Sequence, residues 1–156
     1  MRLRVVPTKA HGVFDLVAGP ALAATPNLLR LNGERGSTLP PRLAGVLGTG
    51  LSALTDYETG AVRVIPLKAH LAFDGASGAA LASAPWLSGA RKNGVRHWLP
   101  HAVVGLAGIA LSLTTRTEPD DRRRNRTPWL VAGIAAAGLA VAGAVAARKW
   151  ASDEEG

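Results

Sequence analysis

The chain has 156 residues, which is enough for one domain or one small bundle of membrane helices. It contains no cysteine, so disulfide frameworks, thiolate metal sites and thiol redox chemistry are excluded. The net charge of +7 suits anionic lipid headgroups, whereas an aromatic content of 4% gives no support to nucleic-acid binding. No dinucleotide-binding, phosphate-loop, serine-hydrolase or zinc-protease motif occurs, so an enzymatic activity is not expected.

An internal repeat organises the chain. The sequence VPTKAH at 6–11 returns as IPLKAH at 65–70, and 12 of the 23 residues at 7–29 are identical at an offset of 59. The second half of the unit repeats at an offset of 60, for example at Gly45 and Gly105. Each unit predicts two helices joined by a polar turn, at 32–37 and at 88–94. Pro7 and Pro66 are predicted to lie in the first turn of their helices.

The fold predicted from this repeat is all-α, a polytopic transmembrane helical bundle. Its first hairpin repeat spans 5–58 and its second spans 64–118. Strictly apolar runs in these helices are short, so a soluble protein with short buried helices is the alternative. A signal peptide at the N-terminus is disfavoured, because its His and Asp are copied in the middle of the chain.

The last part of the chain adds a further predicted helix. Residues 128–147 run for 20 positions without a charge, long enough to cross about 30 Å of hydrocarbon. We therefore predict a basic loop at 119–127, an additional transmembrane helix at 128–148 and an acidic tail at 149–156. The arginines at 122–126 would lie on the same side as the N-terminus, which favours a cytoplasmic N-terminus.

A pair of histidines and aspartates is the sharpest chemical signal. His11 and Asp15 lie four residues apart, on the helix face that also carries Gly19, and His70 and Asp74 copy them. Parallel repeats would place both pairs at the same depth of the bundle. The pairs could join helices through buried hydrogen bonds, or they could handle protons or ions. They could also bind a metal, or a haem between His11 and His70.

Polar residues also gather where the first and third helices begin and the second and fourth end. This predicted cluster at one membrane interface comprises Lys9, Lys68, Asp56, Tyr57, Glu58, Thr115 and Glu118. The two lysines are expected to extend toward the interface, with anion binding near the helix N-termini as the alternative.

The repeated pattern resembles the SPW-repeat family of small bacterial integral membrane proteins. In that family each repeat is a pair of transmembrane helices with a Ser-Pro-Trp motif late in the first helix. The corresponding positions here are Thr25-Pro26-Asn27 and Ala84-Pro85-Trp86, and the likeness covers residues 5–118. The resemblance implies a multi-pass protein of the bacterial inner membrane, and it implies no particular activity.

These observations predict a non-enzymatic integral membrane protein of structural or accessory type. Its expected partners are the lipid bilayer and another membrane protein or a second copy of the chain, without nucleic acid. No cofactor is expected. A small proton, ion or solute transporter built on the His-Asp pairs is the alternative, and a haem- or metal-binding membrane protein is the third hypothesis.

Overall fold

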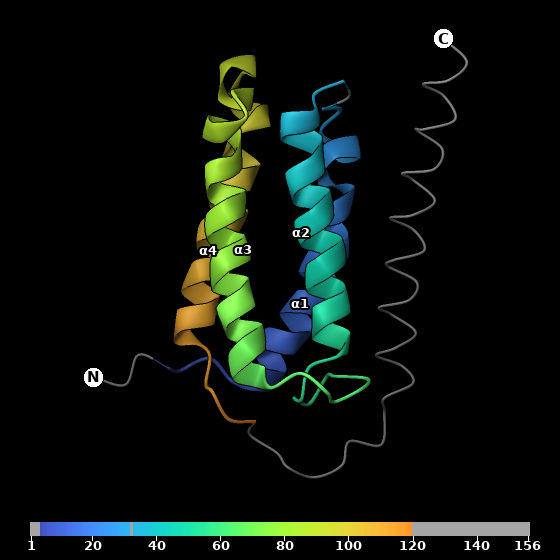
Figure 1. Cartoon of the computed structure of the whole chain (residues 1–156), viewed down its shortest axis with the longest axis vertical. Helices are drawn as coiled ribbons and strands as arrows, with labels where there is room; N and C mark the ends of the chain where they lie inside the picture. The colour runs from blue at the N-terminus through green and yellow to red at the C-terminus, as the bar shows by residue number, and fades with distance from the viewer. Residues whose placement is uncertain (1–3, 32, 120–156) are drawn as a thin grey trace.

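The computed structural model describes residues 4–31 and 33–119. In this part of the chain the regular structure is helical, as the repeat predicts (Figure 1). The four α-helices are α1 (Thr8–Leu28), α2 (Arg35–Ala53), α3 (Leu67–Leu87) and α4 (Leu99–Thr114). Two short 3-10 helices, η1 (Ala90–Asn93) and η2 (Val95–His97), lie between α3 and α4. The predicted fifth helix and acidic tail lie outside the described residues, as does the predicted basic loop apart from Pro119.

The helices form two antiparallel hairpins, α1 with α2 and α3 with α4 (Figure 1). Pro7 and Pro66 occupy the N-cap positions of α1 and α3, one residue before the predicted first turn. A proline has the φ of a helix and lacks an N–H, so it is tolerated on either side of a helix start. The predicted polar turns are partly helical, since α2 already begins at Arg35 and η1 lies within 88–94.

Glycines allow the two helices of each hairpin to touch. A Cβ on Gly45 would overlap the carbonyl oxygen of Gly19 and the backbone nitrogen of Ala23. The copy of this contact is made by Gly105 in α4, where a Cβ would overlap the backbone of Gly78 and Ala82. Small residues at these positions let the helix backbones approach closely, which is typical of helix packing in membranes.

Short backbone pairings close the two hairpins onto each other at the end where α1 and α3 begin. Thr55 pairs with Ile65, and Thr115 pairs with Val6 in the same parallel arrangement. The end of each hairpin therefore lies beside the start of the other. This reciprocal pairing gives the two repeats a pseudo-twofold relation and places the first turns of α1 and α3 next to each other.

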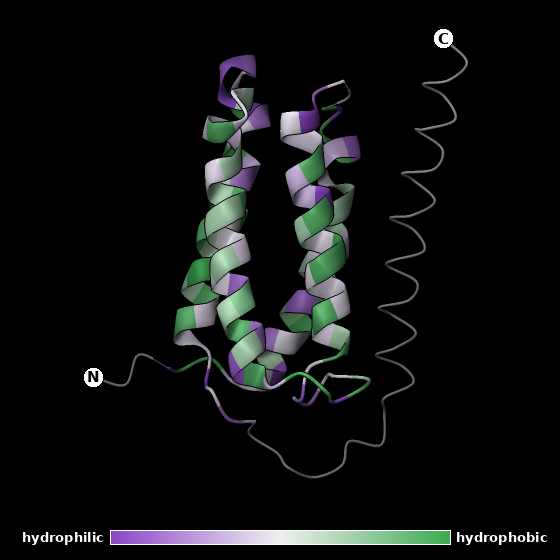
Figure 2. Cartoon of the chain, in the orientation of Figure 1, coloured by the Kyte–Doolittle hydropathy of each residue, from purple (hydrophilic) through white to green (hydrophobic). Residues whose placement is uncertain are grey.

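Many large apolar side chains on the described helices are exposed, and many small polar side chains are buried, beside a small core that includes Leu67 and Leu71. Val17 is 68% exposed, and Leu106 and Leu113 are 60% and 61% exposed. Figure 2 shows that apolar residues occur along the length of all four helices. The buried side chains include many small polar groups and histidines, namely Thr8, His11, Ser37, Thr38, Thr49, Ser52, Thr55, Thr59, His70, His97, His101, Ser112 and Thr115. One described helical segment, Val95–Thr114, is long and apolar enough by length and composition to cross a membrane.

Candidate functional site

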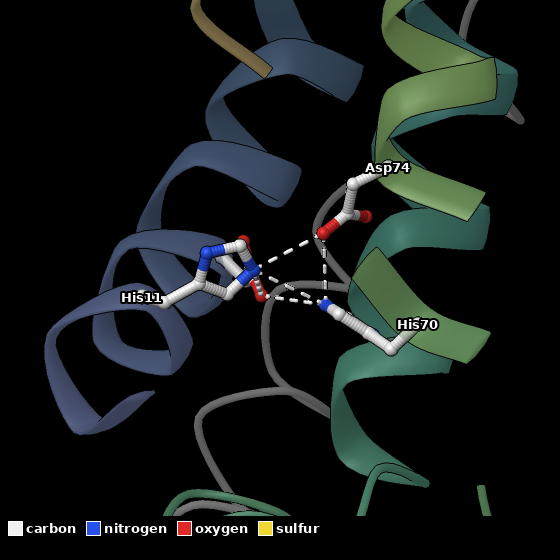
Figure 3. Close-up of side chains that lie close together, drawn as sticks. His11, His70 and Asp74 are labelled. Carbon is white, nitrogen blue, oxygen red and sulfur yellow. Dashed lines mark hydrogen bonds and ion pairs between the residues drawn. The ribbon is translucent and has the colours of Figure 1, made fainter. Parts of the chain in front are cut away.

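The two His-Asp pairs predicted from the repeat meet in one cluster between α1 and α3 (Figure 3). Within each helix, His11 Nε2 lies 3.3 Å from Asp15 Oδ2 and His70 Nε2 lies 3.0 Å from Asp74 Oδ2. Between the helices, His11 Nε2 lies 3.1 Å from Asp74 Oδ2, and His70 Nε2 lies 3.1 Å from Asp15 Oδ2. The two Nε2 atoms are 3.4 Å apart.

The helices bring these atoms together by their register. A spacing of four residues places His and Asp on one face of each helix, and the reciprocal pairing of the hairpins puts both faces opposite each other. The two histidine side chains are 1% and 0% exposed, and the two aspartates are 15% and 17% exposed. The two histidines are therefore removed from solvent and the two aspartates keep a small exposed fraction, so most of the charge must be balanced locally.

Two threonines determine which ring nitrogen of each histidine carries a proton. Thr115 Oγ1 donates to the carbonyl oxygen of Leu111 at 2.6 Å and lies 2.9 Å from His11 Nδ1. A hydroxyl has one hydrogen, and a carbonyl oxygen only accepts, so the Nδ1–H of His11 donates to the threonine oxygen. In neutral His11, Nε2 then carries a lone pair that points into the cluster.

The same arrangement holds the second histidine. Thr55 Oγ1 donates to the carbonyl oxygen of Leu51 at 2.7 Å and lies 2.9 Å from His70 Nδ1. Each histidine is thus held by a threonine at the end of the other hairpin. In their neutral forms both histidines present an electron pair at Nε2, and both aspartates present carboxylate oxygens. The four groups facing one another are all acceptors.

Tyr57 adds a donor to one side of the cluster. It is buried in the segment between α2 and α3, where its hydroxyl hydrogen-bonds Ser52 and donates to Asp15 Oδ2 at 3.3 Å. Burial raises the pKa of the Tyr57 phenol, and the charge of Asp15 raises it further, so the phenol stays protonated as a donor. Sequence reasoning placed Tyr57 at this end of the bundle but did not predict its contact with Asp15.

The predicted interface cluster divides between the surface and the interior. Lys9, Lys68, Asp56 and Glu118 are exposed, whereas Tyr57, Glu58 and Thr115 are buried. The Thr8 hydroxyl donates to the Glu58 carboxylate, whose two oxygens both lie 2.8 Å from Thr8 Oγ1. Thr8 was not singled out from the sequence, because its counterpart in the second repeat is Leu67.

The motif positions late in α1 and α3 lie away from the histidine cluster. Pro26 and Pro85 are buried, and each helix ends two residues later, at Leu28 and Leu87. Asn27 accepts from Arg42 of α2 at 2.9 Å, whereas the Trp86 ring contacts Trp98 edge-on at a centroid distance of 5.7 Å. The remaining motif positions, Thr25 and Ala84, are partly exposed. These residues stabilise the end of each hairpin and contact no part of the cluster.

A second buried polar contact joins the hairpins at the end where α2 and α4 begin. Ser37 Oγ lies 2.9 Å from His97 Nδ1, and His101 donates from Nε2 to the Ser37 carbonyl oxygen at 2.9 Å. Both histidines follow the polar turn predicted at 88–94, where the fourth helix is expected to begin, and no contact was predicted for them. Their spacing of four residues, about one helical turn, is the signal in the sequence that both could face the same neighbour.

A cavity of about 90 Å³ extends from the cluster along the space between the hairpins. His11, Asp15 and Asp74 line it, and the rest of its wall consists largely of small and apolar residues from all four helices, including Gly19 and Gly78. A volume of this size holds several water molecules. Water in this cavity would therefore contact His11, Asp15 and Asp74.

Comparisons with protein families, with curated proteins and with solved structures find no match to this chain.

Proposed function

We propose that this chain is a multi-pass membrane protein of structural or accessory type. The observation that supports the proposal best is the large number of exposed valines and leucines on the helices, together with buried hydroxyls and histidines between them. In lipid, apolar outer surfaces cost nothing, and close glycine contacts with buried hydrogen bonds hold helices together. The resemblance to the SPW-repeat family supports the same architecture, placed in a bacterial inner membrane.

In this proposal the His-Asp cluster joins the two hairpins at one end and the Ser37 contact joins them at the other. Each hairpin crosses the membrane twice, so the α1–α2 and α3–α4 turns lie on one side. The segment between α2 and α3 lies on the other side, together with the N-terminus, and the basic segment 122–126 favours the cytoplasm for that side.

Single-cysteine labelling tests this topology directly, because the natural chain has no cysteine. Cysteine at Arg35 or Asn93 should react with an impermeant maleimide from one side of sealed vesicles, and cysteine at Arg63 from the other. All three native residues are exposed. Cysteine at Leu106, on the outer face of α4, serves as the control and should not react from either side. Release of the chain by alkaline carbonate, or labelling of all three positions from one side, would contradict the proposal.

A second candidate function is the passage of protons or ions through the bundle. The observation that favours it is the cavity that reaches His11, Asp15 and Asp74 from between the hairpins. Buried acids and histidines beside water are typical of proton pathways in membranes. This candidate function predicts a flux of protons or ions across a membrane that contains the protein.

A further inference from the structure

The His-Asp cluster brings four potential metal ligands within 4.8 Å of one another. We propose that His11, Asp15, His70 and Asp74 bind one divalent transition-metal ion of the zinc class, through both histidine Nε2 atoms and one carboxylate oxygen of each aspartate. This inference goes beyond the structural role, and it is tested by metal binding to the purified chain.

The first argument is the direction of the lone pairs. The threonine contacts place a proton on Nδ1 of each histidine, so that in the neutral side chain Nε2 is the electron-pair donor. Neutral imidazole and ionised carboxylate are the forms in which these side chains ligate metals. All four donor atoms lie within 4.8 Å of one another. Four acceptors that converge in a buried site require a cation or shared protons between them.

The second argument is the spacing of the donor atoms. Zinc ligands at about 2.0–2.1 Å around a tetrahedron are separated from each other by about 3.3–3.4 Å. Four of the separations between His Nε2 and Asp Oδ2 atoms run from 3.0 to 3.3 Å, and the two Nε2 atoms are 3.4 Å apart. Five of the six separations among the donor atoms are therefore within about 0.4 Å of the tetrahedral value, and all six are within 4.8 Å.

The third argument is charge. Two carboxylates and two neutral histidines carry a charge of −2, so a divalent ion makes the buried site neutral. Two extra protons would also give a neutral site, in which each imidazolium faces both carboxylates and the two Nε2 atoms lie 3.4 Å apart. The two states differ in their response to added metal, which a metal titration measures.

The donor set also selects the class of ion. Calcium and magnesium prefer six or more oxygen ligands, whereas a four-coordinate site with two imidazoles suits zinc and related ions. The groups behind the ligands support this choice, because Thr55 and Thr115 accept from the histidines and Tyr57 donates to Asp15. Such partners orient the ligands of metal sites.

The test is metal binding by the full chain in detergent, carrying a purification tag without histidine and stripped with a chelator. Calorimetry with Zn²⁺ should give one ion per chain. Titration with Co²⁺ should give the intense visible bands of a tetrahedral complex, which Zn²⁺ should displace.

Variants connect this binding to the cluster. His70→Gln should abolish stoichiometric binding, and Asp74→His, which keeps four ligands, should retain the tetrahedral Co²⁺ spectrum. Thr55→Val should weaken Zn²⁺ binding about 10–100-fold, because only the support of His70 is lost. His97→Gln and His101→Gln are matched controls, since these buried histidines lie at the other end of the bundle and should leave binding unchanged.

Three results would overturn the proposal. The first is wild-type protein that binds no stoichiometric Zn²⁺, which would leave shared protons as the balance of charge. The second is a pale, octahedral Co²⁺ spectrum. The third is binding that survives His70→Gln but is lost in His97→Gln. Circular dichroism reports whether each variant is folded, and Thr55→Val keeps the test decisive if His70→Gln does not fold.

Discussion

At the scale of single residues, Thr55 and Thr115 hold the two histidines of the cluster in place. Each hydroxyl bonds a carbonyl of its own hairpin and accepts the Nδ1–H of a histidine from the other hairpin. The threonine therefore orients the ring, determines its tautomer and joins two segments of the chain. Removal of one of these hydroxyls leaves a buried N–H without an acceptor.

Replacement of Thr115 by valine, which has the same shape, should lower the free energy of unfolding by about 1–3 kcal/mol, because the His11 Nδ1–H loses its partner in a buried site. The measurement is unfolding of the detergent-solubilised protein, followed by circular dichroism.

The neighbouring Thr114 provides a matched control. Its hydroxyl bonds only carbonyls of its own helix, at Ala110 and Leu111. Thr114→Val should leave stability nearly unchanged. Equal losses from both variants would show that the bond to His11 has no special role.

At the scale of the elements, the packing of each hairpin depends on glycines that face each other. Gly19 meets Gly45 and Gly78 meets Gly105, at corresponding positions of the two repeats. Because backbone lies against backbone at these points, the contact cannot adapt as a flexible side chain would. The register of each hairpin is set there, and that register brings the ends of α2 and α4 to the correct height for Thr55 and Thr115.

Substitution of Gly105 by alanine should therefore separate α3 from α4, since its Cβ would overlap the backbone of Gly78 and Ala82. We expect a loss of about 1–3 kcal/mol in the free energy of unfolding, from overpacking. The measurement is the thermal midpoint in detergent.

Gly108, one turn further along α4, is the control for helix propensity. A Cβ there would meet its nearest atoms at 3.8 and 3.9 Å, which is ordinary contact. Gly108→Ala should be neutral or should stabilise the helix. A similar loss from both variants would contradict the importance of the close contact.

At the scale of the whole molecule, the two hairpins are joined in a reciprocal way. The end of the first pairs with the start of the second at Thr55 and Ile65, and the end of the second returns to the start of the first at Thr115 and Val6. The histidine contacts follow the same exchange. As a result, the cluster exists only when both hairpins are assembled, and the cavity that reaches it is formed by all four helices.

If protons or ions pass through this cavity, Asp15→Asn should abolish a pH-dependent flux across liposomes that contain the wild-type protein. The amide has nearly the shape of the carboxylate but cannot carry its charge at the cavity wall. The measurement is the response of a pH-sensitive dye trapped inside the liposomes.

Asp56→Asn is the control for this flux. Asp56 is an exposed acid at the same end of the bundle, paired with Arg63 at 3.9 Å. The Asp56→Asn protein should give the same flux as the wild type. A wild-type protein with no flux above that of empty liposomes would remove the second candidate function and leave the structural one.

Much of this architecture is present in the sequence. The repeat at offsets of 59 and 60 predicts two similar hairpins, and the spacing of His11 and Asp15 predicts a shared helix face. Because similar repeats fold alike, the sequence also predicts that the two His-Asp pairs lie at equivalent positions of the two hairpins. These features depend on local periodicity, so they can be read from the chain without its tertiary structure.

Only the tertiary structure decided how the pairs meet. The spacing of four residues predicts a bond within each helix, but the contacts of 3.1 Å between His11 and Asp74 and between His70 and Asp15 depend on how α1 and α3 are placed. The bond from Thr115 to His11 links residues far apart in the chain. Such contacts arise from the packing of the two hairpins, which local periodicity does not specify, and they turn two helix motifs into one buried four-residue site.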